Sequence, residues 1–149
     1  MNRICLSFRI ALCGLAVLLS GPSLAQAARD GLPPQPLNAG DCAAYFWERS
    51  EPHALIAVVT LTRGDGLLWQ DGGAIAFTLP VFGDDSIRVG DMLAWDIVPA
   101  GARLEGEITE QRGEDYVLSR AFVRRTLADG ALEVTPLVGL AGCNDRAEP

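Results

Sequence analysis

The sequence predicts an all-β fold, a small antiparallel β-sandwich or barrel of about seven to eight strands. Short segments rich in β-branched and aromatic residues recur through residues 41–143, and Gly, Asp and Pro turn signals separate them at intervals of roughly 8–12 residues. Apolar and polar residues alternate in several of these segments. No long segment has the apolar spacing of an amphipathic helix.

The first expected strand is the segment 41–48 (Asp-Cys-Ala-Ala-Tyr-Phe-Trp-Glu). Asp41 is also a good helix N-cap, so a short helix is the alternative. The three consecutive aromatic residues favour a strand, which we expect here. Residues 53–62, rich in β-branched side chains, form the second expected strand. The Asp65-Gly66 pair after it indicates a tight hairpin turn.

The other expected strands lie between Gly-containing turns, and they cover residues 67–69, 74–82, 87–89, 92–98, 104–109, 116–126 and 131–137. The clearest alternation is in the segment 104–109. There Leu104, Gly106 and Ile108 alternate with charged or polar residues, which predicts a strand with one buried face and one exposed face.

Charges on two neighbouring segments are expected to pair. If residues 111–114 close a hairpin, the strand with Glu105 and Glu107 lies beside the strand with Arg120, Arg124 and Arg125. Opposite charges that face each other across a hairpin stabilise it.

Arg120 is a candidate ligand residue because of the row in which it lies. Tyr116, Leu118, Arg120 and Phe122 are alternate positions and would point the same way along a regular strand. If that row faces inward, Arg120 is a partly buried cation that needs an anion, either a carboxylate of the protein or a ligand. Otherwise the row faces solvent.

Residues 1–27 are expected to be a cleaved signal peptide. The pattern has three parts in order: a positive start at Arg3 and Arg9, an apolar run over residues 10–19, and the small-x-small sequence Ala25-Gln26-Ala27. A transmembrane anchor is the alternative, but spanning a bilayer takes about 20 apolar residues and this run is half that length. The expected location is therefore periplasmic or secreted.

The rest of the chain is expected to be one domain with two flanking segments. Residues 28–40 hold Pro and Gly at a density that excludes helix or central strand, so they form an extended arm or tether. Residues 41–143 form the single β domain, and residues 144–149 a polar tail. No second apolar run approaches membrane-spanning length, so no transmembrane segment remains after cleavage.

The charge balance argues against nucleic acid as a partner. The chain has 12 basic and 19 acidic residues, a net charge of −7. Loss of residues 1–27 removes two basic residues and no acidic one, so the remainder carries −9. Such a surface repels phosphate backbones and anionic lipid.

Two of the four cysteines, Cys42 and Cys143, lie outside the signal segment, at opposite ends of the domain. In an oxidising compartment such a pair is most simply a disulfide. A redox pair or a metal site is the alternative, although the chain offers neither CxxC spacing nor a nearby histidine.

No catalytic constellation stands out. His53 is the one histidine, and no G-x-S-x-G motif accompanies the serines. Acidic residues in Gly-rich loops could hold Ca²⁺ (Asp65, Asp71, Asp84, Asp85 and Asp91), but they match no EF-hand loop. We assign no catalytic residue, metal or cofactor. Trp47 and Trp69 are candidate binding residues, because exposed together they would mark a binding patch.

Two cysteine-flanked ends carry a family resemblance. The segment Asp41-Cys-Ala-Ala-Tyr-Phe-Trp47, a run of strands and the closing Val138-Gly-Leu-Ala-Gly-Cys143 resemble small uncharacterised exported proteins of alphaproteobacteria. The resemblance implies a periplasmic location and a disulfide across the termini. It implies no activity.

The leading functional hypothesis is a non-enzymatic binding or accessory module of the cell envelope, whose partner is an envelope protein or a small ligand. One alternative is a small hydrolase of envelope polymers, which needs two carboxylates converging in a cleft. Another is an inhibitor of an envelope-directed enzyme that presents a loop such as 63–66 or 83–85.

Overall fold

The structure, a computed structural model, describes residues 31–80 and 87–145. The expected signal peptide, residues 1–27, lies outside the described residues. The described chain forms eight antiparallel β-strands and one short 3₁₀ helix, with no α-helix among these residues. The prediction of an all-β antiparallel fold is confirmed.

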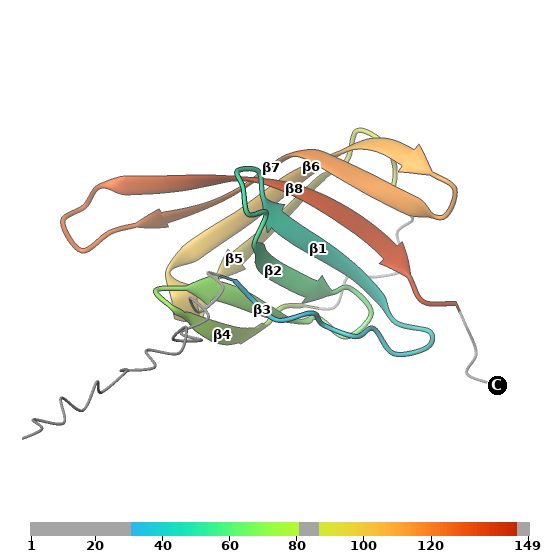
Figure 1. Ribbon diagram of the computed structural model, residues 1–149, viewed down its shortest axis with the longest axis horizontal. Helices are drawn as coiled ribbons and strands as arrows, with labels where there is room; N and C mark the ends of the chain where they lie inside the picture. The colour runs from blue at the N-terminus through green and yellow to red at the C-terminus, as the bar shows by residue number, and fades with distance from the viewer. Residues whose placement is uncertain (1–30, 81–86, 146–149) are drawn as a thin grey trace, which may run out of the picture.

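Figure 1 shows the elements in chain order. They are β1 Cys42–Glu48, β2 Leu55–Thr60, β3 Asp65–Gln70, β4 Gly73–Thr78, β5 Met92–Ile97, the 3₁₀ helix η1 Val98–Ala100, β6 Ala102–Arg112, β7 Asp115–Thr126 and β8 Leu132–Cys143. The segment 41–48 is therefore a strand from Cys42 onward and not a helix.

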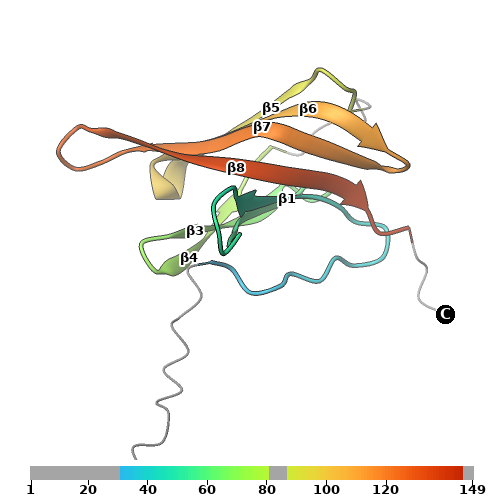
Figure 2. The same cartoon turned by 45° about the horizontal axis from the view of Figure 1, so that its top comes forward.

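One curled sheet contains all eight strands in the order β4-β3-β2-β1-β8-β7-β6-β5. The first and last strands meet in its middle, where Cys42 lies opposite Cys143. From this seam the chain's first half runs outward through β2, β3 and β4, and its second half through β7, β6 and β5. Curling brings the two halves face to face, and Figure 2 shows them as an upper and a lower layer.

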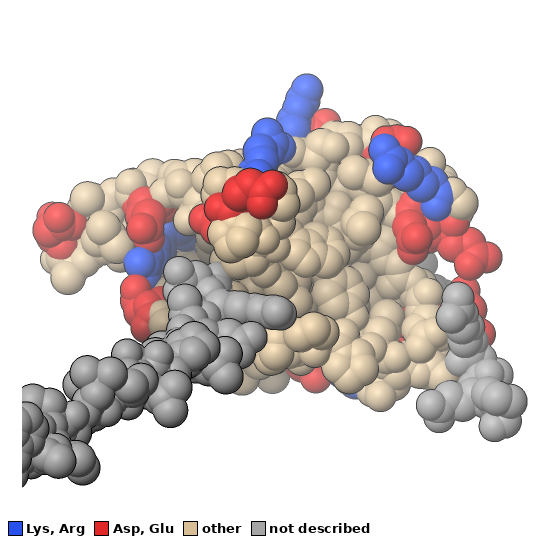
Figure 3. Space-filling view, in the orientation of Figure 1, with Lys and Arg blue, Asp and Glu red and all other residues tan. Residues whose placement is uncertain are grey.

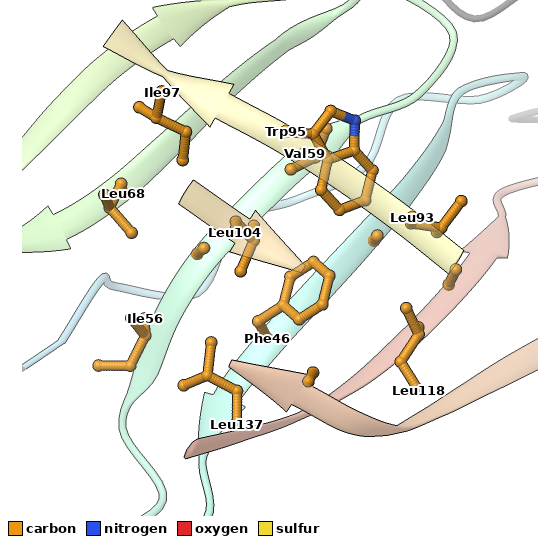
Figure 4. Close-up of a cluster of buried hydrophobic side chains, with 14 of the residues drawn as sticks. Phe46, Ile56, Val59, Leu68, Leu93, Trp95, Ile97, Leu104, Leu118 and Leu137 are labelled. Atoms are coloured by element: carbon orange, nitrogen blue, oxygen red, sulfur yellow. The ribbon is translucent and has the colours of Figure 1, made fainter. Parts of the chain in front are cut away.

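The main core fills the space between these two halves (Figure 4). Phe46 of β1 is fully buried at its centre, and the ring of Trp95 meets it edge-on at a centroid distance of 5.9 Å. Leu104, Leu118 and Leu137 are also fully buried. Burying side chains of this size stabilises the fold by about 1.5–3 kcal/mol each.

One expected strand and one expected turn are wrong. Residues 87–89 form no strand, because Asp91 closes a turn by accepting a 2.8 Å hydrogen bond from the Arg88 amide. The Asp65-Gly66 pair lies inside β3 and not in a turn, which occupies residues 61–64 instead. Gly66 is needed for close approach, since a Cβ there would lie 2.6 Å from the Val58 carbonyl oxygen.

A second apolar cluster lies on the outer face of β1–β3, beneath the Pro-rich arm. Leu32 of the arm is buried there with Ala43 and Val58. The Leu32 amide donates a 2.7 Å hydrogen bond to the Leu55 carbonyl, which fixes the start of the arm. Figure 2 shows the arm, in blue, running along the side of this half that faces away from β5–β8. The described arm is thus docked on the sheet.

The outer face of β5–β7 carries the expected charge pairs. The Arg124 guanidinium lies 2.9 Å from the Glu105 carboxylate, and that of Arg120 lies 3.0 Å from Glu107. Arg125 lies on the opposite face of β7 and makes different contacts. Pairs this exposed each contribute about 0–1 kcal/mol, and the face needs no cover from another element.

The predicted disulfide between Cys42 and Cys143 is present and joins β1 to β8 across a sequence separation of 101. The cross-link therefore ties the central seam at the end where the chain enters and leaves the sheet. No helix of the described residues has the length and apolar character needed to cross a membrane.

We predict that the Cys42→Ser/Cys143→Ser variant folds but is less stable by up to about 4–5 kcal/mol, because the unfolded chain regains the freedom of a loop of about 100 residues. Urea unfolding followed by circular dichroism measures the loss. Dithiothreitol should lower the stability of the parent protein by a similar amount and leave that of the variant unchanged. A variant as stable as the oxidised parent would contradict a stabilising role.

Candidate functional site

Arg120 points to solvent. The β7–β8 register shifts between Leu118 and Ala121, so both of these residues face the core and the regular alternation is broken. The Arg120 side chain is 76% exposed and contacts only the Glu107 carboxylate among charged groups of the described chain. Arg120 is thus an exposed ion-pair residue.

Trp47 and Trp69 line different hollows. Trp47 lies on the outer face, beside the arm and the β1–β2 turn. Trp69 lines a cleft of about 460 Å³ at one end of the curled sheet, together with the inward-facing core residues Ile56 and Leu68. The two tryptophans therefore line different hollows, and Arg120 lines neither of these two. Trp69 also packs against the outer apolar cluster that includes Tyr45 and Leu55.

An arginine closes the end cleft that Trp69 lines. The Arg125 guanidinium donates a 2.8 Å hydrogen bond to Asp71 in the β3–β4 turn, and it also bonds Glu133 on β8. This bridge connects the two halves of the sheet across the opening. It was not predictable from sequence, because Asp71 and Arg125 are 54 residues apart.

The environment of Asp71 in the end cleft does not suit this carboxyl group to acid catalysis. The hydrogen bond from Arg125 lowers the pKa of the Asp71 carboxyl group, whereas a general acid needs a raised pKa. The hydrogen bonds that Arg125 donates to Asp71 and Glu133 raise the pKa of its guanidinium, which therefore stays charged. The cleft holds a stable ion pair between its two walls.

The other candidate chemistries gain no support in the described part of the chain. The ring nitrogens of His53 contact the Glu48 carbonyl oxygen at 3.2 Å and the Glu51 carboxylate at 3.3 Å, and neither bonds a serine hydroxyl of the described residues. No group of three or more His, Cys, Asp or Glu side chains in residues 31–80 and 87–145 is placed to hold a metal ion. Asp84 and Asp85, part of the calcium hypothesis, lie outside the described residues.

The best candidate binding surface is built on two aromatic side chains of β1. Tyr45 and Trp47 are alternate residues of one strand, so both side chains point to the outer face. Their rings stack with centroids 6.0 Å apart and planes inclined by 18°. Both residues are half-buried, and β1 lies in the middle of the sheet, so the pair is held on a rigid support.

The arm crosses Tyr45 and is held there by its phenol. The Tyr45 hydroxyl donates a 3.1 Å hydrogen bond to the Gln35 carbonyl oxygen. Burial raises the pKa of the Tyr45 phenol, so the hydroxyl keeps its proton at neutral pH. Further along, the Asn144 side-chain amide donates a 2.8 Å hydrogen bond to the Leu37 carbonyl oxygen and secures the end of the arm.

Two hollows flank the arm, and Tyr45 and Gln35 line both. The first, of about 610 Å³, lies beside Trp47, and among the described residues no Lys, Arg, Asp or Glu lines it (Gly31, Leu32, Pro34, Gln35, Tyr45, Trp47, Pro52, His53, Ala54 and Leu55). The second, of about 710 Å³, lies over β3 and β4 and includes Arg63 and Asp65. We call the first the aromatic hollow.

Figure 3 shows the distribution of charged side chains on one face of the molecule. The middle of the face that carries β1 and β2 in Figure 1 is a broad uncharged area, and acidic and basic side chains gather along its upper margin and its sides. In a chain with a net charge of −7, an uncharged face of this extent is a distinct feature.

The sequence held one signal for this surface. Strand β1 is apolar on both faces, since Ala44 and Phe46 point inward while Ala43, Tyr45 and Trp47 point outward. A strand that is apolar on both faces has to be covered on both. The neighbouring arm holds Leu32 and Leu37 among its prolines, and it was therefore the candidate segment to cover the outer face of β1.

Comparison with known proteins identifies no relative: the chain matches no family model, no curated protein and no solved structure.

We predict that Arg125→Gln raises the pKa of Asp71 back toward the ordinary value of an aspartic acid, because the variant removes the charged hydrogen-bond donor. Carbon-detected NMR titration of the Asp71 carboxyl group measures this change. With the lowered pKa, the stabilising contribution of Asp71 is present above about pH 4 and is lost as the pH falls through the folded-state value.

The matched control for Arg125→Gln is Arg120→Gln, which removes an exposed arginine of the same strand and should leave the Asp71 titration unchanged. An Asp71 pKa that is the same in the parent and in Arg125→Gln would show that the bridge does not form in solution.

Proposed function

We propose that this protein is a non-enzymatic binding module of the cell envelope, and that the face around Tyr45 and Trp47 is its binding surface. The observation that carries the proposal is the stacked aromatic pair at the edge of a hollow that no Lys, Arg, Asp or Glu of residues 31–80 and 87–145 lines. Tyr and Trp supply large contact areas at a low cost in side-chain entropy, and they are enriched among the residues that dominate binding energy.

The scaffold suits such a role. The pair lies on the central strand, next to β8, and a disulfide ties these two strands together. A surface that is ordered before binding loses less entropy when a partner docks. We regard the curled sheet as a partly open barrel, because residues of η1, directly after β5, contact β4 at the other edge of the sheet.

A hydrolase acting through paired carboxylates has less support. In the end cleft Arg125 neutralises Asp71 and lowers its pKa, which is opposite to what a general acid requires. No other observation in the described residues favours catalysis over binding.

The proposed location is the periplasm or the exterior of the cell. The signal-like segment 1–27 motivates this location. The disulfide is consistent with it, because disulfides persist in oxidising compartments. The resemblance to exported proteins of alphaproteobacteria belongs to the same proposal.

We predict that the protein recovered from its host begins at Ala28, because signal peptidase reads the small residues Ala25 and Ala27. N-terminal sequencing of the protein from an osmotic-shock fraction is the measurement. Ala27→Phe should block the cut and leave a chain 27 residues longer, held with the membranes. Recovery of an uncleaved parent chain from the cytoplasm would refute the proposed export.

We predict that the oxidised protein, used as bait, retains specific components of an envelope extract, and that Trp47→Ala loses them. Quantitative mass spectrometry of the eluates measures retention. Leu132→Ala is the matched control, because Leu132 is 62% exposed but lies on the β7–β8 hairpin. Equal retention by the parent and Trp47→Ala would exclude this face, and retention of nothing by a folded bait would exclude a stable protein partner.

A further inference from the structure

We infer that the open edge of β8 beside the β7–β8 hairpin binds an extended segment of a partner protein as an added β-strand, and that this segment carries Lys or Arg between two apolar residues. The site consists of residues 132–135 and the end cleft next to them. It goes beyond the proposed function, because it lies apart from the aromatic hollow and offers different groups.

Strand β8 is longer than the part of it that β1 covers. β1 ends at Glu48, opposite Leu137, and the Arg49 amide donates one further hydrogen bond to the Pro136 carbonyl oxygen. Beyond Pro136, no strand of residues 31–80 and 87–145 pairs with this edge of β8. Figures 1 and 2 show the β7–β8 hairpin extending past the end of β1. Residues 132–135 thus have a strand on one side only within the described chain.

Hydrogen bonds on either side of this stretch fix the direction of its backbone groups. The Pro136 carbonyl points toward β1, whereas the Ala131 carbonyl oxygen accepts a 2.8 Å hydrogen bond from the Leu127 amide across the hairpin. Successive residues of an antiparallel strand direct their backbone groups to alternate edges, so those of Leu132 and Val134 point away from β7. Each of these two residues therefore offers an N–H and a C=O group to an added strand.

The end cleft lies on the inner side of this edge and has an excess of negative charge. Its lining includes the carboxylates of Glu48, Asp71 and Glu133 but, among the described residues, one cation, Arg125. Arg125 pairs with Asp71 and Glu133, and no cation of the described chain pairs with Glu48. The cleft also has an apolar wall, to which Trp69 belongs, so it can hold the aliphatic part of a long basic side chain.

The edge and the cleft select the same occupant. An added antiparallel strand continues the line of β1, and its residue opposite Glu133 points inward, into the cleft. Lys or Arg at that position supplies a counter-charge for Glu48. Its two neighbours point outward, opposite Leu132 and Val134, which are 62% and 51% exposed. Apolar residues are therefore expected on both sides of the basic one.

A second copy of this chain fits the edge less well. Antiparallel pairing of two β8 edges through Leu132 and Val134 places Glu133 opposite the same residue of the second copy. Like charges directly opposite each other destabilise a strand pair. The net charge of −7 on each chain adds a general repulsion. A basic segment avoids both costs.

The test uses ¹⁵N-labelled oxidised protein and three capped pentapeptides. The probe is Thr-Val-Lys-Val-Thr. One control peptide has Glu in place of Lys, and the other has N-methyl groups on both valine amides, which removes their hydrogen-bond donors. We expect the probe to shift the amide signals of Leu132 and Val134, and both control peptides to bind roughly tenfold more weakly or worse.

A proline variant tests the backbone edge. Val134→Pro removes an N–H group that points away from β7, and the sheet already contains a proline at the equivalent position, Pro136. The fold should persist, as circular dichroism will show, while the affinity for the probe falls roughly tenfold or more. Val134→Ala keeps the amide and is the matched control, which should retain most of the binding.

A charge variant tests the cleft. Glu48→Gln should weaken binding of the probe by about two- to fivefold and leave binding of the Glu-containing peptide no weaker than before. Glu114→Gln is the matched control, because Glu114 is exposed in the β6–β7 turn, at the opposite end of β7 from the hairpin. It should leave the affinity for the probe unchanged.

Strand addition would be overturned by equal affinity for the probe and its N-methylated form, by shifts that avoid β8, or by a folded Val134→Pro variant that binds as tightly as the parent. Equal affinity for the Lys and Glu peptides would overturn the basic specificity. Movement of the Leu132 and Val134 signals on dilution without peptide would identify a second copy as the occupant instead.

The outcome is separable from that of the proposed function. In the capture experiment, components that are lost with Trp47→Ala but retained by Leu132→Ala report on the aromatic hollow alone. A β8 edge that binds no peptide would therefore leave the proposed binding face standing, and failure of Trp47-dependent capture would leave the β8 edge to be decided by the peptides.

Discussion

The double burial of β1 is the constraint on which the rest of the structure depends. Phe46 on its inner face is in contact with both halves of the curled sheet, and Tyr45 on its outer face lies under the arm. Gly139, opposite Phe46 on β8, has no side chain to occupy the space of the ring, and a Cβ there would lie 3.0 Å from the Phe46 Cδ1 atom. The central strand therefore fixes both the curl of the sheet and the need for an outer cover.

The two halves of the curled sheet are joined by backbone pairing and a disulfide at the seam, and by side-chain hydrogen bonds away from it. At the seam, seven residue pairs and a disulfide join β1 to β8. The outermost strands, β4 and β5, are not neighbours in the ladder, and side chains connect the two halves there. Gln70 donates a 3.3 Å hydrogen bond to the Ala100 carbonyl oxygen, and Arg125 bridges to Asp71. The seam is thus the more strongly held part, and it carries the candidate binding face.

Sequence reasoning succeeded where a pattern is local and failed where one residue changes the register. The alternation of Leu104, Gly106 and Ile108 gave the correct inner face of β6, and the pairing of Glu105 with Arg124 followed from it. The row through Arg120 was misleading because the shift between Leu118 and Ala121 inserts a residue that no local pattern reveals. The arm was predicted to be extended, but its docking depends on contacts with strands that are remote in sequence.

The two halves of the outer surface of the sheet carry different kinds of side chains, and this difference indicates which half is the better candidate for binding a partner. Over β5–β7 the outward side chains are arginines and carboxylates that satisfy one another, so that half is stable facing water. Over β1–β3 most of them are apolar or aromatic, with Thr60 and Asp65 as exceptions, and the arm covers only part of this surface. The uncovered part, beside Trp47, keeps apolar surface in contact with water. A partner that completes the cover gains the free energy of removing that surface from water, with the sheet already in the required conformation.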